Sequence, residues 1–139
     1  MSLEHAVEII VQAFIEMIDE QPNVRVYDYE LKFKDYNDIQ GQTLLPAPAL
    51  PKDKEQAENV IRRVVQDSVS SFADFLLQSD VVLGELGSIE ITYGIPEPGI
   101  DDSPGVDYGT RATLHITWKS KRNQELSSKN SGLNEEVIK

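Results

Sequence analysis

The sequence predicts an α+β domain in which two helices cover one face of a small antiparallel sheet that ends in a β-hairpin. Apolar residues recur at helical spacing over residues 3–20 and again over 53–78. Three other segments, 25–34, 88–94 and 110–119, alternate apolar and polar residues, as strands with one buried face do. The apolar face of each strand needs a cover, so we expect both helices to lie on that side of the sheet.

The first helix is apolar over more than one of its faces. Ser2 is a suitable N-cap, and Glu4 places a negative charge in the first turn. Three residues widen the apolar stripe beyond the side that would face a sheet: Ile9, Val11 and Ile15. A helix with so broad an apolar surface is packed on two sides, either within its own domain or by another subunit. We therefore take these three residues as candidates for an interaction surface.

The segment between the helices combines a strand with a proline-rich stretch. Residues 25–34 place aromatic and aliphatic side chains on one face and charged side chains on the other. Residues 44–51 contain Pro46, Pro48 and Pro51, which indicates either a sheet edge or an extended, polyproline-like connector. The stretch also matches a loose polyproline ligand. A linker is the favoured interpretation, and the three prolines are kept as interaction candidates.

The second helix leads into the terminal hairpin. Asp53 followed by Gln56 resembles a capping box, and the stretch from Gly84 to Gly87 is expected to close the connection before the first hairpin strand. The apolar faces of the two hairpin strands are formed by Ile89, Ile91 and Tyr93, and by Ala112, Leu114, Ile116 and Trp118. Tyr93 and Trp118 join the interaction candidates because they stand near the ends of these strands.

Length and composition indicate one domain over residues 1–119 followed by a polar, flexible tail over 120–139. The stretch at the start of the chain resembles neither a signal peptide nor a membrane span. The chain contains no cysteine, which excludes disulfides, thiolate metal sites and cysteine nucleophiles. A cytoplasmic location is expected.

A net charge of -11 and a pI near 4.5 argue against binding to a nucleic-acid backbone. Such binding uses clustered Lys and Arg side chains to release counterions. We expect protein partners, leave self-association into a homo-oligomer open, and expect neither nucleic acid nor membrane as a partner.

The sequence contains no pattern that predicts catalysis. His5 and His115 lie in different elements, and no Gly-x-Ser-x-Gly motif is present. Four acids lie between the hairpin strands, where they are expected to be solvated and not to bind a metal: Glu97, Asp101, Asp102 and Asp107. We therefore expect no enzyme activity, no cofactor and no metal.

Residues 57–119 resemble the trypsin-co-occurring domains of the first type, which are found in bacterial conflict systems. In those domains a helix precedes a strand that ends in an aromatic residue and glycine, and the last strand ends in Thr-Trp and a basic residue. Tyr93-Gly94 and Thr117-Trp118-Lys119 stand at the matching positions. The resemblance implies a non-catalytic accessory or adaptor domain of a defence system that accompanies a trypsin-like effector.

A second resemblance is to the tail-terminator and neck proteins of long-tailed phages. Those small α+β chains also have an early helix, a later helix and a terminal pair of strands. Val24 to Asp28 after the first helix, and the proline-rich stretch before the second, are similar to pieces of those proteins. This resemblance implies a structural subunit of a ring, located in the virion.

Overall fold

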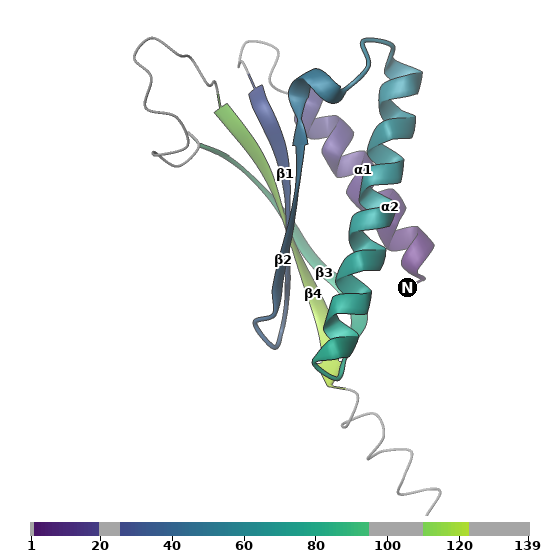
Figure 1. Ribbon diagram of the computed structural model, residues 1–139, viewed down its shortest axis with the longest axis vertical. Helices are drawn as coiled ribbons and strands as arrows, with labels where there is room; N and C mark the ends of the chain where they lie inside the picture. The colour runs from purple at the N-terminus through teal and green to yellow at the C-terminus, as the bar shows by residue number, and fades with distance from the viewer. Residues whose placement is uncertain (1, 20–25, 95–109, 123–139) are drawn as a thin grey trace, which may run out of the picture.

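The computed structural model describes residues 2–19, 26–94 and 110–122. In chain order the elements are α1 (Leu3–Asp19), β1 (Val26–Asp35), β2 (Gln40–Pro46), the 3-10 helix η1 (Ala47–Ala49), α2 (Lys54–Gln78), β3 (Val81–Gly94) and β4 (Thr110–Arg122). The two helices pack side by side against one face of a single sheet, and no helix of the described residues lies on the other face (Figure 1). The predicted α+β class and the predicted placement of both helices are confirmed.

The sheet is mixed, and not antiparallel as expected. The strand order is β2-β1-β4-β3, and the two central strands, β1 and β4, run parallel. The pairs β1–β2 and β3–β4 are antiparallel, so the terminal hairpin is present as predicted. The alternation of apolar residues is the same in both kinds of ladder, so it does not reveal the relative direction of two strands that are far apart in the sequence.

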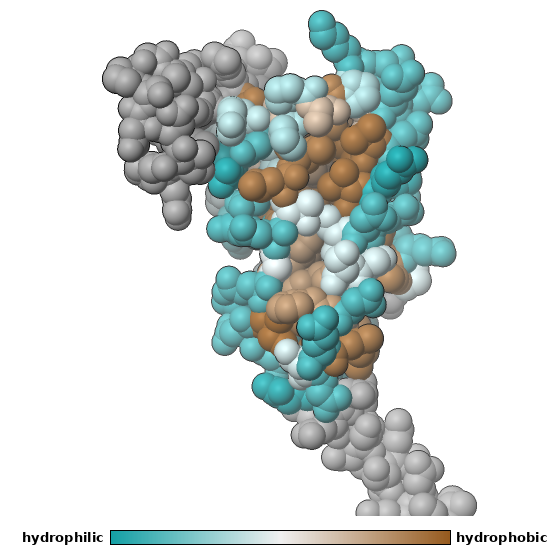
Figure 2. Space-filling model, viewed as in Figure 1, coloured by the Kyte–Doolittle hydropathy of each residue, from teal (hydrophilic) through white to brown (hydrophobic). Residues whose placement is uncertain are grey.

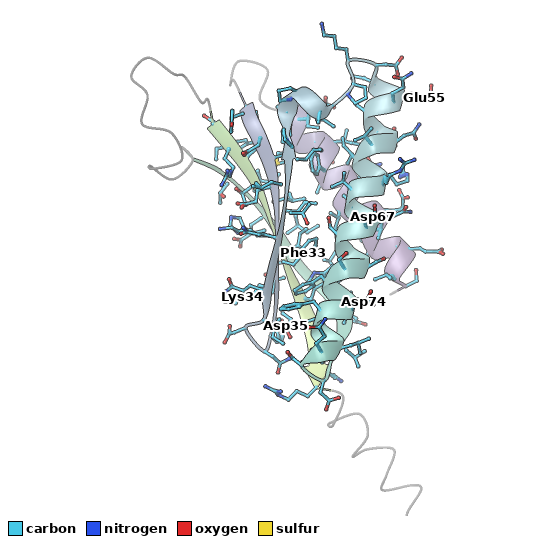
Figure 3. The ribbon with its side chains drawn as sticks, in the orientation of Figure 1. Phe33, Lys34, Asp35, Glu55, Asp67 and Asp74 are labelled. Carbon is cyan, nitrogen blue, oxygen red and sulfur yellow. The ribbon has the colours of Figure 1, made fainter. Side chains whose placement is uncertain are left out.

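The core lies between the helix layer and the sheet. The largest fully buried side chains come from every layer and include Phe14 of α1, Leu31 of β1, Ile61 of α2 and Trp118 of β4. Phe33 points toward the helices, where its ring stacks on that of Phe72 at 5.3 Å between centroids, while Lys34 points away from them (Figure 3). The period-2 pattern of β1 therefore separates the apolar side chains that face the helices from the charged side chains on the opposite face of the sheet.

Local side-chain hydrogen bonds define where the elements begin. Ser2 accepts from the backbone N–H of His5 at 3.2 Å, and Asp53 accepts from that of Gln56 at 3.1 Å, so both predicted N-caps are present. In the β1–β2 turn the buried Asp35 accepts from the backbone N–H of Ile39 at 2.7 Å. These bonds satisfy backbone donors that would otherwise have no partner.

Strand β3 begins at Val81, seven residues before the predicted start. Its pairing with β4 is irregular between Val82 and Glu85 and again between Leu86 and Ser88. Gly84 and Gly87, expected in a connection, lie in these two irregular stretches. Glycine suits such sites because bulged strands bring backbones close together.

Strand β4 continues to Arg122, so residues 120–122 belong to the sheet and not to the predicted tail. The rest of that tail, residues 123–139, lies outside the described residues. So do residues 20–25 and 95–109, which include Val24 and the acids Glu97, Asp101, Asp102 and Asp107.

Candidate interaction surfaces

An apolar groove runs between α1 and the edge strand β3. It is lined by Ile9 and Ala13 of α1 and by Ile89 and Ile91 of β3, and its volume is about 510 Å³. The two helical residues are four positions apart and the two strand residues two positions apart, so each pair shares one face of its element. All four side chains are only half-buried, since the stripe of α1 that faces the core lies to one side of them. We call this surface the α1–β3 groove.

Acidic and polar side chains of α1 border the α1–β3 groove. Glu8, Gln12 and Glu16 line it beside the four apolar residues. The carboxylate of Glu8 accepts from Arg62 of α2 at 3.0 Å, and Arg62 also binds Glu58 at 3.1 Å. Glu16 forms no ion pair with another described residue. An apolar strip with a partly unneutralised acidic border suits a protein surface that carries apolar and basic side chains.

Two of the sequence-derived interaction candidates are core residues. Val11 is 0% exposed and Trp118 is 1% exposed, so neither presents a surface to a partner. The alternation in β4 explains Trp118, because it lies on the same face as the buried Leu114 and Ile116. Its indole N–H has no acceptor among the described residues. Of the helix candidates, Ile9 lies in the α1–β3 groove and Ile15 is half-buried against the core.

Tyr93 lies near the end of β3 with 38% of its surface exposed. Its neighbour Tyr29 is buried in the core and packs on Phe14 with 5.3 Å between ring centroids. Burial raises the pKa of Tyr29 above its usual value of 10.0, and the charge that Tyr93 acquires on ionisation raises that pKa further. The two phenols are therefore electrostatically coupled, and the exposed one remains a candidate contact residue.

The three proline candidates lie where β2 meets the connection to α2. Pro46 is the last residue of β2 and is exposed, Pro48 is exposed within η1, and Pro51 is half-buried. The backbone N–H of Leu50 donates to the carbonyl of Ala47 at 3.1 Å, which closes the 3-10 turn. Residues 44–46 therefore form a sheet edge, and 47–49 form a helical turn and not a polyproline helix.

The face of the sheet without helices carries an ion-pair network that the sequence did not reveal. Arg111 of β4 makes two hydrogen bonds to Asp28 of β1, at 2.7 and 3.0 Å, and its guanidinium lies 3.9 Å from Glu30. Thr113 donates to Glu30 at 3.2 Å. Asp28 and Glu30, which the strand pattern places on the charged face, are only 5% and 4% exposed. The parallel register places Asp28 opposite Arg111, and this pairing depends on the topology.

The two histidines do not come together. His5 is exposed in the first turn of α1, whereas the imidazole of His115 lies on the sheet face that carries no helix, 2.8 Å from the hydroxyl of Thr92. A hydroxyl next to an imidazole is part of the geometry of nucleophilic catalysis, which also needs a group that orients the ring. No carboxylate among the described residues hydrogen-bonds to this imidazole. The pair is thus a strand-to-strand polar contact.

A broad hollow of about 610 Å³ surrounds His115 on this face. Its charged lining consists of Lys32 and Lys34 of β1 and Glu90 of β3, and Gln40 and Gln42 of β2 contribute amides. Lys34 is already paired with Asp38 at 3.3 Å, and Lys32 lies 3.9 Å from Glu30. Within the described residues, no group of His, Asp and Glu side chains has the arrangement of a metal site.

No protein-family model matches the chain, and no curated protein or solved structure matches it at a significant level. Neither helix of the described ranges is long and apolar enough to cross a membrane.

Proposed function

We propose that the protein is a non-enzymatic interaction module that binds a protein partner through the α1–β3 groove. The observation that supports this function is the half-buried apolar set of Ile9, Ala13, Ile89 and Ile91 beside an acidic border. Ala13, Ile89 and Ile91 pack against the hydrophobic core and extend it to the surface at one edge of the sheet, and Ile9 lies beside them in the groove. Contiguous apolar surface of this kind is typical of contact sites between proteins.

The proposed biological role is that of an accessory or adaptor domain in a bacterial defence system, located in the cytoplasm. Support comes from the two strand-end signatures behind the first resemblance. Tyr93-Gly94 ends β3, and Thr117-Trp118-Lys119 lies near the end of β4, the strand that pairs with β3. In this role the partner is a trypsin-like effector, as the first resemblance implies.

The alternative role is a structural subunit of a phage tail or neck, assembled into a ring in the virion. The presence of α1 before the first strand supports this role, because the second resemblance includes an early helix, a later helix and a terminal strand pair. In this case the α1–β3 groove would contact the next copy of the same chain, and repetition of a head-to-tail contact closes a ring.

Co-expression with the products of neighbouring genes tests the module and separates the two roles. Copurification at a fixed ratio with an effector-type protein supports the adaptor, whereas a closed homo-oligomer by light scattering supports the ring subunit. The variant Ile9→Asp, combined with Ile91→Asp, places charges on both walls of the groove and should abolish either association. Because both side chains are half-buried, circular dichroism of this variant must first show a folded chain.

Leu77→Asp is the matched control, since Leu77 is 56% exposed on α2 and does not line the groove. It should leave the association intact. An interaction that survives the double groove variant, or is lost equally with the control, contradicts the proposed surface. Hydrolytic activity that disappears in His115→Ala would contradict the non-enzymatic assignment.

A further inference from the structure

The two edges of the sheet differ in how they are protected against pairing with another chain. β3 has two irregular stretches and carries Glu85 and Glu90, both of which are common features of protected edges. β2 pairs regularly with β1 from Gln40 to Pro46 and contains no charged residue. Its proline stands at the very end of the strand. The β2 edge is therefore the one that can accept another strand.

The backbone groups of β2 that point outward can be identified from the turn before it. The N–H of Asp35 donates to the carbonyl of Ile39 at 3.1 Å, so these two residues form a hydrogen-bonded pair. Hydrogen-bonded pairs alternate with non-hydrogen-bonded pairs along an antiparallel ladder, so every second residue of β2, counted from Ile39, forms its backbone hydrogen bonds with β1. The N–H and C=O groups of Gln40, Gln42 and Leu44 consequently point away from β1. Pro46 follows at the next outward position, where its missing N–H costs the sheet no hydrogen bond.

An apolar groove of about 260 Å³ lies between this edge and α2. Phe33, Phe72 and Phe75 contribute aromatic surface to it, and Phe75 is 44% exposed. Gly41 widens it on the β2 side, because a Cβ there would come within 3.0 Å of the Phe72 ring. Figure 2 shows hydrophobic surface along the boundary between β2 and α2, with hydrophilic residues around it. An added strand would direct every second side chain into this groove.

The outer border of the groove is acidic. Ser71 of α2 lines the groove, and Asp67 and Asp74 lie one turn before and after it on the same side of the helix (Figure 3). Neither aspartate forms an ion pair with another described residue, and Arg63 stands one turn before Asp67. Basic side chains on an added strand would meet these carboxylates.

The same charges disfavour a second copy as the occupant. A two-fold pairing of β2 with itself would bring two α2 helices together with Asp67 and Asp74 of both copies on adjoining surfaces. Each copy also carries a net charge of -11, so the copies repel one another at long range.

We propose that β2 binds an extended segment of a partner protein by strand addition, with apolar side chains in the β2–α2 groove and Lys or Arg beside Asp67 and Asp74. The outward N–H and C=O groups of β2 supply the affinity, and the groove and its acidic border supply the selectivity. This surface lies at the opposite edge of the sheet from the α1–β3 groove. Either surface can fail its test without affecting the other.

A labelled probe peptide, Lys-Thr-Val-Thr-Val-Thr-Lys, tests the proposal by fluorescence anisotropy on the full chain. On one face it presents two valines flanked by lysines, and on the other it presents threonines. We expect saturable binding below about 1 mM. A peptide with Glu in place of both Lys should bind roughly tenfold more weakly, and Asp67→Lys combined with Asp74→Lys should reverse that preference.

Gln42→Pro removes one outward N–H without removing a hydrogen bond to β1, and it should weaken binding of the lysine peptide roughly tenfold. Amide hydrogen exchange should slow at Gln40, Gln42 and Leu44 when the peptide binds. The proposal is overturned if the lysine peptide does not bind below that concentration, if the lysine and glutamate peptides bind the unaltered chain equally well, or if the slowed amide exchange maps to another surface. A dimer of the unliganded chain that Gln42→Pro dissociates would also overturn it, in favour of a second copy.

Discussion

Replacing Gly84 with alanine should destabilise the protein more than any other glycine substitution in β3. A Cβ at this position would lie 2.0 Å from the carbonyl oxygen of Lys119, 2.8 Å from its carbonyl carbon and 3.2 Å from the Cα of Ser120. All three atoms belong to the backbone of β4, so no side-chain rotation relieves the contact. The two strands must separate by about 1 Å at the irregular stretch, where Gly84 also donates its N–H to Ser120.

The expected cost follows from two opposing effects. Forcing an extra carbon into a packed site costs about 1 to 3 kcal/mol, and more where the backbone must move. Alanine also reduces the conformational entropy of the unfolded chain, which offsets about 0.5 to 1 kcal/mol of this cost. Because the backbone must move here, the cost lies at the upper end of that range, and the net loss in the free energy of unfolding should be about 2 kcal/mol. A loss of this size lowers the Tm by roughly 7 °C for a domain of this size.

Urea titration followed by far-ultraviolet circular dichroism measures this loss, and two other glycines provide matched controls. A Cβ at Gly87 would stand 3.0 Å from the carbonyl oxygen of Thr117, so Gly87→Ala should cost about 1 kcal/mol. Among the described residues other than its chain neighbours, none has an atom within 4 Å of a Cβ at Gly94, so Gly94→Ala should be neutral or slightly stabilising. If Gly84→Ala unfolds at the same urea concentration as Gly94→Ala, the close approach of β3 to β4 at this point does not exist.

Three further substitutions test other parts of the structure. Asp28→Asn removes one charge of the buried pair with Arg111 and should cost about 2 kcal/mol in urea titration, and a loss below about 0.5 kcal/mol would refute the pairing. Asp53→Ala deletes the N-cap of α2 and should cost about 1 kcal/mol, whereas Asp53→Ser should retain most of the stability. Because the pKa of Tyr29 is raised in the folded state, the unfolded chain ionises first, and the stabilisation that is complete below pH 10.0 declines as pH rises through the folded pKa. Tyr29→Phe should therefore lose less stability than the wild type between about pH 9 and about pH 11; equal losses would contradict the raised pKa.

Elements with a strong local pattern could be predicted from the sequence. The N-caps at Ser2 and Asp53 and the long apolar stripes located both helices to within a residue or two. The alternation in β4 identified Trp118 as one of four side chains on a single face, and all four are buried. Such patterns depend on neighbours a few residues away, which the sequence displays directly.

Features that depend on long-range pairing could not be predicted. The glycines of β3 indicate a turn when read alone, because the close approach of β4 that requires them is visible only in the folded chain. The strand pattern places Asp28 on a charged face but does not reveal its partner, because Arg111 is 83 residues away. The sequence pattern predicted only part of the α1–β3 groove. Ile9 was among the predicted interaction residues, but Ala13, Ile89 and Ile91 were not. Their half-burial depends on how far α1 extends over β3.

The parallel pairing of β1 with β4 also affects when the chain can fold. Tyr29 pairs with Ala112, which the ribosome adds 83 residues later. At about 5 to 20 residues per second, roughly 4 to 17 s of synthesis separate the two partners. During that interval β1 can form a hairpin with β2, but its second edge has no partner until β4 is synthesised. The sheet can therefore be completed only after β4 has been translated. Until then the unpaired edge of β1 is open to the wrong pairings that chaperones prevent.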